Sequence, residues 1–202
     1  MYRYIKRLLD IIGSLLGLIL MIPVCILVKI SFLLMGDTKS MFFKHIRIGK
    51  DGKPFMMYKF RSMVYNAEEL LDELLKDEQY RKDWAENQKI ENDPRTTPVG
   101  IFLRKSSIDE LPQLLNVLKG DMSIVGPRPL VEGELEAHGG SKLYWQAKPG
   151  ITGWWGTHGR SDVDYNQRLE LEYYYIQNMS FKLDVICFFK TITSVVRHKG
   201  AV

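Results

Sequence analysis

The first thirty-five residues carry the strongest hydrophobic pattern in the chain. Residues 11–28 contain no charged side chain, and the apolar character continues to Met35. Basic residues precede this segment and also follow it: Arg3, Lys6 and Arg7 on one side, and Lys29, Lys39, Lys44 and Arg47 on the other. A simple spanning helix usually has its basic residues on one side only. The pattern therefore predicts a membrane segment whose two ends both face the cytoplasm.

Pro23 lies near the middle of this segment. Proline removes a backbone donor and bends or breaks a helix. Each arm would then be roughly 18 Å long, which is too short to cross a hydrocarbon core of about 30 Å. We expect residues 1–36 to form a re-entrant helix-break-helix hairpin, and one kinked spanning helix is the alternative. Residues 22–25 do not resemble a signal-peptide cleavage site.

The rest of the chain, residues 37–202, is predicted to be one cytoplasmic catalytic domain of the α/β class, rich in helix, with a small sheet and helices at the membrane interface. Two short extended runs, at 42–43 and 55–58, flank the turn 49–54. A charged helix is expected over 66–84, within a helical excursion that covers 66–90. Further helices are expected over 165–177 and after Ser180, which is a candidate cap.

Composition limits the classes of partner. The formal charge of +4 and the pI of about 8.9 favour an anionic membrane surface or a phosphorylated ligand, and they do not require nucleic acid. Cys25 and Cys187 form no disulfide or zinc pattern, which indicates a reducing compartment. The four histidines form no metal-binding pattern either.

Two adjacent acids, Asp109 and Glu110, are the most informative chemical feature. Ser107 is predicted to cap a helix, with Glu110 at its third position, as in a capping box. The apolar stripe of this helix follows, and Gly120 is expected to end it. Capping and the helix dipole alone would explain such a pair in most proteins.

Cations near this pair change the interpretation. Arg104 and Lys105 precede it, Arg128 stands between two prolines that restrict its backbone, and Arg160 follows a glycine. Nearby positive charge keeps a carboxylate ionised. An ionised carboxylate among phosphate-binding cations can attack phosphorus or hold a divalent metal.

Several motifs along nearly the whole chain carry a family resemblance. They are the proline-interrupted hydrophobic segment, Tyr58-Lys59-Phe60-Arg61-Ser62-Met63, Asn92-Asp93-Pro94-Arg95, Leu103 to Leu114, Asn116 to Ser123, Gly126-Pro127-Arg128-Pro129, Lys148 to Gly153, and Gly159-Arg160. In this order they resemble the bacterial sugar transferase family, the monotopic polyprenyl-phosphate phosphoglycosyl transferases.

The resemblance implies a reaction and the residues that perform it. Asp109 would attack the β-phosphorus of a UDP-sugar, release UMP and hold the sugar phosphate covalently. Polyprenyl phosphate, usually undecaprenyl phosphate, would then accept it. Magnesium would be held by Asp109 and Glu110. Lys59, Arg104 and Arg128 would bind phosphate or shape the site, and Arg160 is a weaker correspondence.

The same resemblance implies a place and a pathway. The enzyme would sit at the bacterial inner membrane, with its site on the cytoplasmic face and in contact with membrane lipids. It would perform the first membrane step of exopolysaccharide or glycoconjugate assembly. The sequence leaves open which sugar is carried and the oligomeric state, a homodimer included. Ile22-Pro23, Gly156-Thr157-His158 and Glu172 depart from common family patterns.

Two other functions compete with this one. Asp162-Val163-Asp164 is an Asp-x-Asp that could bind a metal–diphosphate in an ordinary glycosyltransferase, which would release UDP in place of UMP. A membrane-tethered scaffold would bind anionic lipid through its basic face and would not need Asp109. Both alternatives explain fewer of the motifs than the phosphoglycosyl transferase does.

Overall fold

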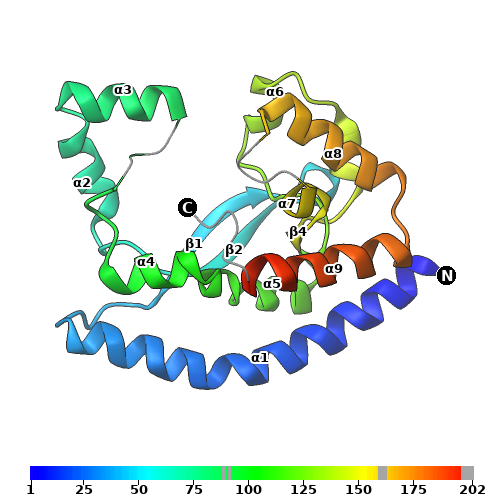
Figure 1. Cartoon of the computed structure of the whole chain (residues 1–202), viewed down its shortest axis with the longest axis horizontal. Coiled ribbons are helices and arrows are strands. Elements are labelled where there is room, and N and C mark those ends of the chain that lie inside the picture. The colour runs from blue at the N-terminus through cyan, green and yellow to red at the C-terminus, as the bar shows by residue number, and fades with distance from the viewer. Residues whose placement is uncertain (88–89, 91, 159–162, 197–202) are drawn as a thin grey trace.

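The computed structural model describes residues 1–87, 90, 92–158 and 163–196. In these ranges the chain is mostly helical, and its strands form two separate two-stranded sheets (Figure 1). The helices are α1 (Tyr2–Leu34), α2 (Ala67–Leu74), α3 (Glu78–Asn87), α4 (Pro98–Lys105), α5 (Gln113–Lys119), α6 (Glu134–Ala137), α7 (Trp154–His158), α8 (Tyr165–Gln177) and α9 (Phe181–Val196). The strands are β1 (Phe42–Ile48), β2 (Pro54–Phe60), β3 (Ser123–Val125) and β4 (Gly150–Thr152). Short 3-10 turns cover Lys50–Gly52, Ile108–Glu110 and Lys142–Gln146.

The two sheets replace the one small sheet that the sequence predicts. Strands β1 and β2 form the expected antiparallel hairpin, in which Phe42 pairs with Phe60 and Ile48 with Pro54. Strands β3 and β4 are parallel and only three residues long. A Cβ added at Gly150 would lie 2.1 Å from the backbone nitrogen of Gly126, so this close pairing requires glycine.

Helix α1 continues through Pro23. The predicted break is therefore absent from the described helix, because a proline costs only the hydrogen bonds next to it and the turns on either side retain theirs. Figure 1 shows α1 as one gently bent rod. At roughly 50 Å it is long and apolar enough to cross a membrane by length and composition. Its depth in a bilayer remains a prediction.

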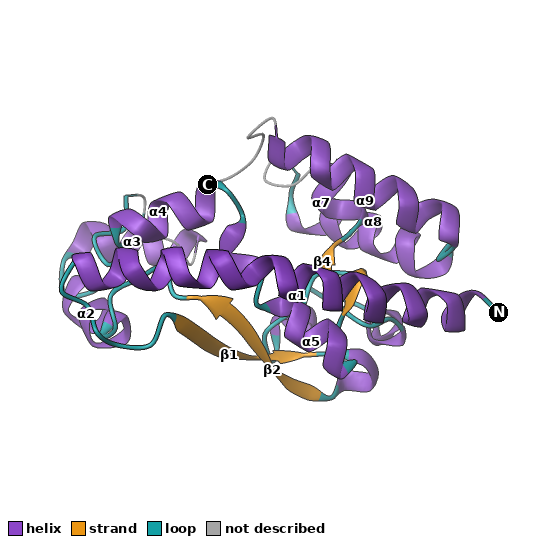
Figure 2. Cartoon of the chain, turned by 90° about the horizontal axis from the view of Figure 1, so that it is seen from below, coloured by secondary structure: helices purple, strands orange, loops and turns teal. Residues whose placement is uncertain are grey.

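One face of α1 packs on the rest of the chain along the length of the helix (Figure 2). Near its start, Arg7 donates a hydrogen bond of 2.6 Å to the carbonyl oxygen of Val117 in α5. Near its end, Phe32 is fully buried against Phe60 and Leu103. The opposite face exposes its apolar side chains: Ile5, Leu8, Leu9, Ile12, Leu15, Leu16, Ile19, Leu20, Ile22, Ile26, Leu27, Ile30, Leu33 and Leu34. A continuous apolar face of this size is typical of membrane contact.

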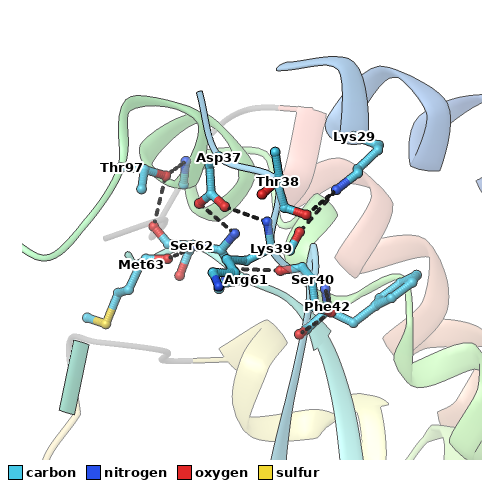
Figure 3. A network of polar contacts seen from close by, with 11 residues as sticks. Lys29, Asp37, Thr38, Lys39, Ser40, Phe42, Arg61, Ser62, Met63 and Thr97 are labelled. Carbon is cyan, nitrogen blue, oxygen red and sulfur yellow. Dashed lines mark hydrogen bonds and ion pairs between the residues drawn. The ribbon is translucent and has the colours of Figure 1, made fainter. Parts of the chain in front are cut away.

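A polar network fixes the segment that follows α1 (Figure 3). The buried Arg61 guanidinium forms an ion pair of 2.7 Å with Asp37 and donates to the carbonyl oxygens of Ser40 and Met63. The Arg61 guanidinium also lies over the Phe32 ring, 4.6 Å from its centroid. These contacts hold the end of β2 against α1, and thereby place the residues that follow β2.

The excursion after β2 consists of two helices and not the single helix expected over 66–84. Helix α2 ends at Leu74, and α3 begins at Glu78. Asp77 accepts a hydrogen bond of 2.8 Å from the backbone N–H of Gln79. A side chain that binds backbone in this way starts a new helix, which explains the interruption.

Candidate active site

One face of the β1–β2 hairpin forms the wall of a large cavity. Side chains alternate between the two faces of a strand, so the pairs Phe43–Lys59 and His45–Met57 share this face with Arg47. All five line a cavity of about 710 Å³, which we call cavity 1. The hairpin thus presents Lys59 and Arg47 from two adjacent strands to one space.

The turn that carries Asp109 and Glu110 faces the same cavity, but it is not the start of an α-helix. Ser107 has a φ of 56°, and its side chain caps nothing. The acids lie in the 3-10 turn Ile108–Glu110, and α5 begins only at Gln113. The predicted capping box is therefore wrong, because a left-handed Ser107 does not place its hydroxyl on the N–H groups of the first turn. The predicted end of the helix at Gly120 is confirmed, with a φ of 94°.

Lys59 contacts both acids. Its Nζ lies 3.0 Å from Glu110 Oε1 and 3.8 Å from Asp109 Oδ2. The side chain of Asp109 is only 13% exposed, and that of Glu110 is 37% exposed. Asp109 and Glu110, which we call the dyad, therefore comprise one sheltered and one more exposed carboxylate. Lys59 of β2 lies close to both.

Arg104 joins the dyad from α4. Its Nε donates a hydrogen bond of 2.9 Å to Ser62 Oγ, and both side chains line cavity 1. Thr97 caps α4 by accepting a hydrogen bond of 2.9 Å from the backbone N–H of Gly100. The cap and the Ser62 contact fix the last turn of α4, so Arg104 adds positive charge beside Asp109.

The electrostatics of Asp109 differ from the sequence-based expectation that neighbouring cations keep it ionised. Burial raises the pKa of Asp109 above its ordinary value, and the charge of Glu110 adds to the rise, while Lys59 and Arg104 oppose it. Burial outweighs the two cations because desolvation penalises the charged form of the carboxyl group. Additional positive charge would favour the carboxylate that a nucleophile requires.

The two acids are suited to a magnesium ion that also binds a diphosphate. Magnesium is usually held by one or two carboxylates together with substrate phosphates. Among the described residues no group of three or more His, Cys, Asp or Glu side chains could form a complete metal site. Asp109 and Glu110 supply two carboxylates from one turn, which fits the protein's share of such a site.

Arg128 lines a second cavity beside the first. This cavity, cavity 2, has a volume of about 480 Å³ and shares Arg47, Lys59 and Glu110 with cavity 1. Asp109 lines cavity 1 only, among the described residues. The structure therefore brings Lys59, Arg104, Asp109 and Glu110 together and places Arg128 in the adjoining space. Arg160 lies outside the described residues.

From the sequence, Arg47 is one of the basic residues that flank the membrane segment, Trp155 is a candidate for stacking on uracil or for the membrane interface, and Glu172 is a departure from the family pattern. Glu172 is 1% exposed, and its Oε1 accepts a hydrogen bond of 3.0 Å from the backbone N–H of Arg128. The ring of Trp155 lies 5.8 Å from the Arg128 guanidinium carbon. In the sequence, only the two prolines beside Arg128 pointed to a structured site here. The contacts of Arg128 with Glu172 and Trp155 join residues far apart in the chain, which no local pattern reveals.

We predict that Glu172 makes stability depend on pH. Burial raises its pKa to about 7. Because the folded protein then holds the proton more tightly than the unfolded chain, stability falls as the pH rises from about 4.5 through about 7. The total loss is about 3 kcal/mol. Glu172→Gln should flatten this part of the stability curve, measured by chemical denaturation in detergent between pH 4.5 and 8. Equal slopes in both proteins would contradict the prediction.

Asp164, the second acid of the Asp-x-Asp motif at 162–164, has a structural role. Asp164 caps α8 and accepts a hydrogen bond of 2.8 Å from the backbone N–H of Gln167, which completes a capping box. Asp162 lies outside the described residues. Asp164 therefore offers no support for a metal–diphosphate site of the glycosyltransferase type.

Comparison with known proteins points in one direction. Residues 1–198 match the family described as bacterial sugar transferase. A UDP-galactose-lipid carrier transferase of Erwinia amylovora is 45% identical over 201 residues, which are 98% of this chain and 42% of that protein. An undecaprenyl-phosphate galactose phosphotransferase of Salmonella typhimurium gives the same identity and coverage. The exopolysaccharide production protein ExoY of Sinorhizobium fredii is 42% identical over 198 residues, 97% of this chain and 87% of that protein. The chain spans less than half the length of the first two relatives.

Proposed function

Because the chain belongs to the bacterial sugar transferase family, we propose that it transfers a sugar 1-phosphate from a UDP-sugar to a polyprenyl phosphate. The observation that carries the proposal is the sheltered Asp109, which lies in one cavity with Glu110, Lys59 and Arg104. Relatives named for undecaprenyl phosphate and for exopolysaccharide production support the acceptor and the pathway. The donor sugar is a matter for experiment, since the relatives' names include both galactose and N-acetylgalactosamine.

The proposed reaction has two steps, joined by a covalent intermediate on Asp109. A carboxylate oxygen of Asp109 attacks the β-phosphorus of the UDP-sugar, the bond from that phosphorus to the bridging oxygen breaks, and UMP leaves. A phosphate oxygen of the lipid then attacks the same phosphorus, the bond to Asp109 breaks, and the carboxylate is restored. Covalent capture of this kind divides one difficult transfer into two easier ones.

The neighbouring residues serve these steps through charge and position. Lys59 and Arg104 stabilise the charge that develops on the phosphate oxygens. Asp109 and Glu110 would hold magnesium with the diphosphate, and the ion would neutralise charge and favour the ionised form of Asp109. Glu110, the more exposed acid, keeps Lys59 next to the reacting carboxylate through its 3.0 Å contact.

We further propose that α1 lies within one leaflet of the inner membrane, with the cavities on the cytoplasmic side. If α1 crossed the bilayer, the charged elements packed along it would enter the hydrocarbon core, which is unfavourable. The exposed apolar face of α1, continued by Ile101 and Phe102 of α4 and by Phe188, Phe189 and Ile192 of α9, suits an interfacial position. The basic residues on both flanks of the helix support the same side for both of its ends.

A nucleotide-release assay with intact-protein mass spectrometry tests the function. The purified protein is incubated with magnesium and a panel of UDP-sugars, without acceptor. We expect UMP and a protein mass increased by one sugar phosphate, and the mass returns to its original value when undecaprenyl phosphate is added. Release of UDP without a covalent adduct would favour the ordinary glycosyltransferase instead.

A further inference from the structure

Cavity 2 adjoins the dyad from the side opposite the α2–α3 excursion. Besides the residues shared with cavity 1, it is lined by side chains of α5, α7 and α9. Residues of the excursion, among them Glu68 and Glu69, line cavity 1 instead. Glu110 and Lys59 stand in the common wall. A ligand in cavity 2 can therefore approach the reacting turn while another occupies cavity 1.

Two guanidinium groups, those of Arg47 and Arg128, line cavity 2; Glu134 acts on both from a distance, and no described carboxylate forms an ion pair with either. The side chains of Arg47 and Arg128 form no hydrogen bond or ion pair with any other described residue, and Arg47 Nε is buried without a partner. Trp155 also lines cavity 2, and its Nε1 is buried without a hydrogen-bond partner among the described residues. Burial and the charge of Arg128 both lower the pKa of Arg47. Two guanidinium groups held near each other in this way attract an anion such as a phosphate group.

Much of the remaining lining of cavity 2 is apolar. It includes Leu111, Leu114, Ile151, Phe188 and Ile192. Leu114 packs directly on α1, since a Cβ added at Gly17 would lie 2.7 Å from Leu114 Cδ1. These apolar side chains thus adjoin α1 through Leu114 and include residues of α9, the two helices whose exposed apolar faces suit a membrane.

We propose that cavity 2 binds the lipid acceptor, with its phosphate at Arg47 and Arg128 and its first isoprene units along Phe188 and Ile192. A lining that combines two cations with apolar side chains fits an amphiphile with an anionic head. A UDP-sugar is polar throughout and suits cavity 1, where most lining residues are polar or charged. This assignment rests on the proposed function, and it gives Arg47 a binding role in the second step of the reaction.

The test uses the variant Arg47→Gln and measures two steps separately: formation of the covalent adduct from UDP-sugar, and its discharge to the lipid acceptor. Because Arg47 also lines cavity 1, the losses in the two steps are compared. We expect discharge of the adduct to subsaturating acceptor to slow at least about tenfold more than adduct formation does, because a charge-assisted hydrogen bond to the lipid phosphate is lost. Lys44→Gln, on the same strand but outside both cavities, is the matched control and should leave both steps unchanged. Adduct formation slowed as much as discharge, or more, would place Arg47 with the donor and overturn the proposal.

A soluble acceptor separates the cavity from membrane seating. Geranyl phosphate carries two isoprene units and needs no bilayer. Phe188→Asn should raise its KM about fivefold or more. Phe189→Asn should not, because Phe189 is exposed beside Phe188 but does not line cavity 2. Equal effects of the two variants would mean that α9 serves only as a membrane contact, against the proposal.

Equilibrium binding of geranyl phosphate keeps this inference distinct from the proposed function. If the wild type formed no adduct with any UDP-sugar, the proposed function would fail. The assignment of cavity 2 would still stand if geranyl phosphate bound and Arg47→Gln weakened its binding at least about tenfold. Binding that is indifferent to both Arg47→Gln and Phe188→Asn would refute the assignment whatever the protein catalyses. Thermal unfolding of each variant confirms that the fold is retained.

Discussion

Asp109→Asn should abolish the covalent adduct and lower turnover of lipid acceptor by about a thousandfold or more. The amide has nearly the same shape as the carboxylate but cannot act as the nucleophile, and its neutral side chain no longer balances Lys59 at 3.8 Å. Loss of the nucleophile should therefore stop the first step while nucleotide binding persists. The measurements are the intact mass after incubation with UDP-sugar, and the rate of lipid diphosphate formation.

The matched control for this variant is Asp51→Asn. Asp51 lies in the exposed turn between β1 and β2, lines neither cavity, and has a φ of 60°, which asparagine tolerates well. It should keep both the adduct and the rate of turnover. Native turnover by the Asp109 variant would instead support the scaffold interpretation or another nucleophile, and would remove the basis of the proposed function.

Gly100→Ala should have the largest effect on stability. A Cβ at this position would lie 1.8 Å from the carbonyl oxygen of Ser62. That oxygen accepts hydrogen bonds from the backbone N–H and the hydroxyl of Thr97, at 3.0 and 3.2 Å, so it has little freedom to move away (Figure 3). We expect a loss of about 3 kcal/mol and a fall in Tm of roughly 10 °C.

Activity should fall with stability in this variant, because displacement of α4 moves Arg104 from Ser62 and from the dyad. Gly156→Ala is the comparison, since no heavy atom lies within 4 Å of its added Cβ and its φ is not positive. The two proteins are compared by thermal unfolding in the same detergent. A native Tm for Gly100→Ala would show that α4 does not lie so close to Ser62, in the segment after β2.

Elements defined by local signals could be predicted from the sequence. The helix expected over 165–177 is confirmed as α8, and the start of the last helix after Ser180 is confirmed as α9. Both have a clear change of pattern at their N-termini, and Ser180 Oγ accepts a hydrogen bond from the Leu183 N–H. The β1–β2 hairpin is confirmed as well, because its strands flank a turn rich in glycine and charge.

Features that depend on backbone geometry or on distant contacts could not be predicted. The spacing from Ser107 to Glu110 is the same in a capping box and in a 3-10 turn, and only the positive φ of Ser107 distinguishes them. Arg47 and Arg128 enter one cavity from β1 and from the loop after β3, and no local pattern links positions so far apart. Side-chain chemistry thus indicated the dyad, whereas the second cavity required the fold.

Helix α1 carries an exposed apolar face and also forms part of the protein interior. Met21, Val28 and Phe32 belong to the same buried cluster as Phe60 and Leu103. An unrelated hydrophobic anchor could not replace these first thirty-four residues, because the interior would lose one of its walls. If the exposed face contacts lipid as we propose, selection on this segment must satisfy lipid and protein at once, and its two faces have unequal freedom to change in evolution.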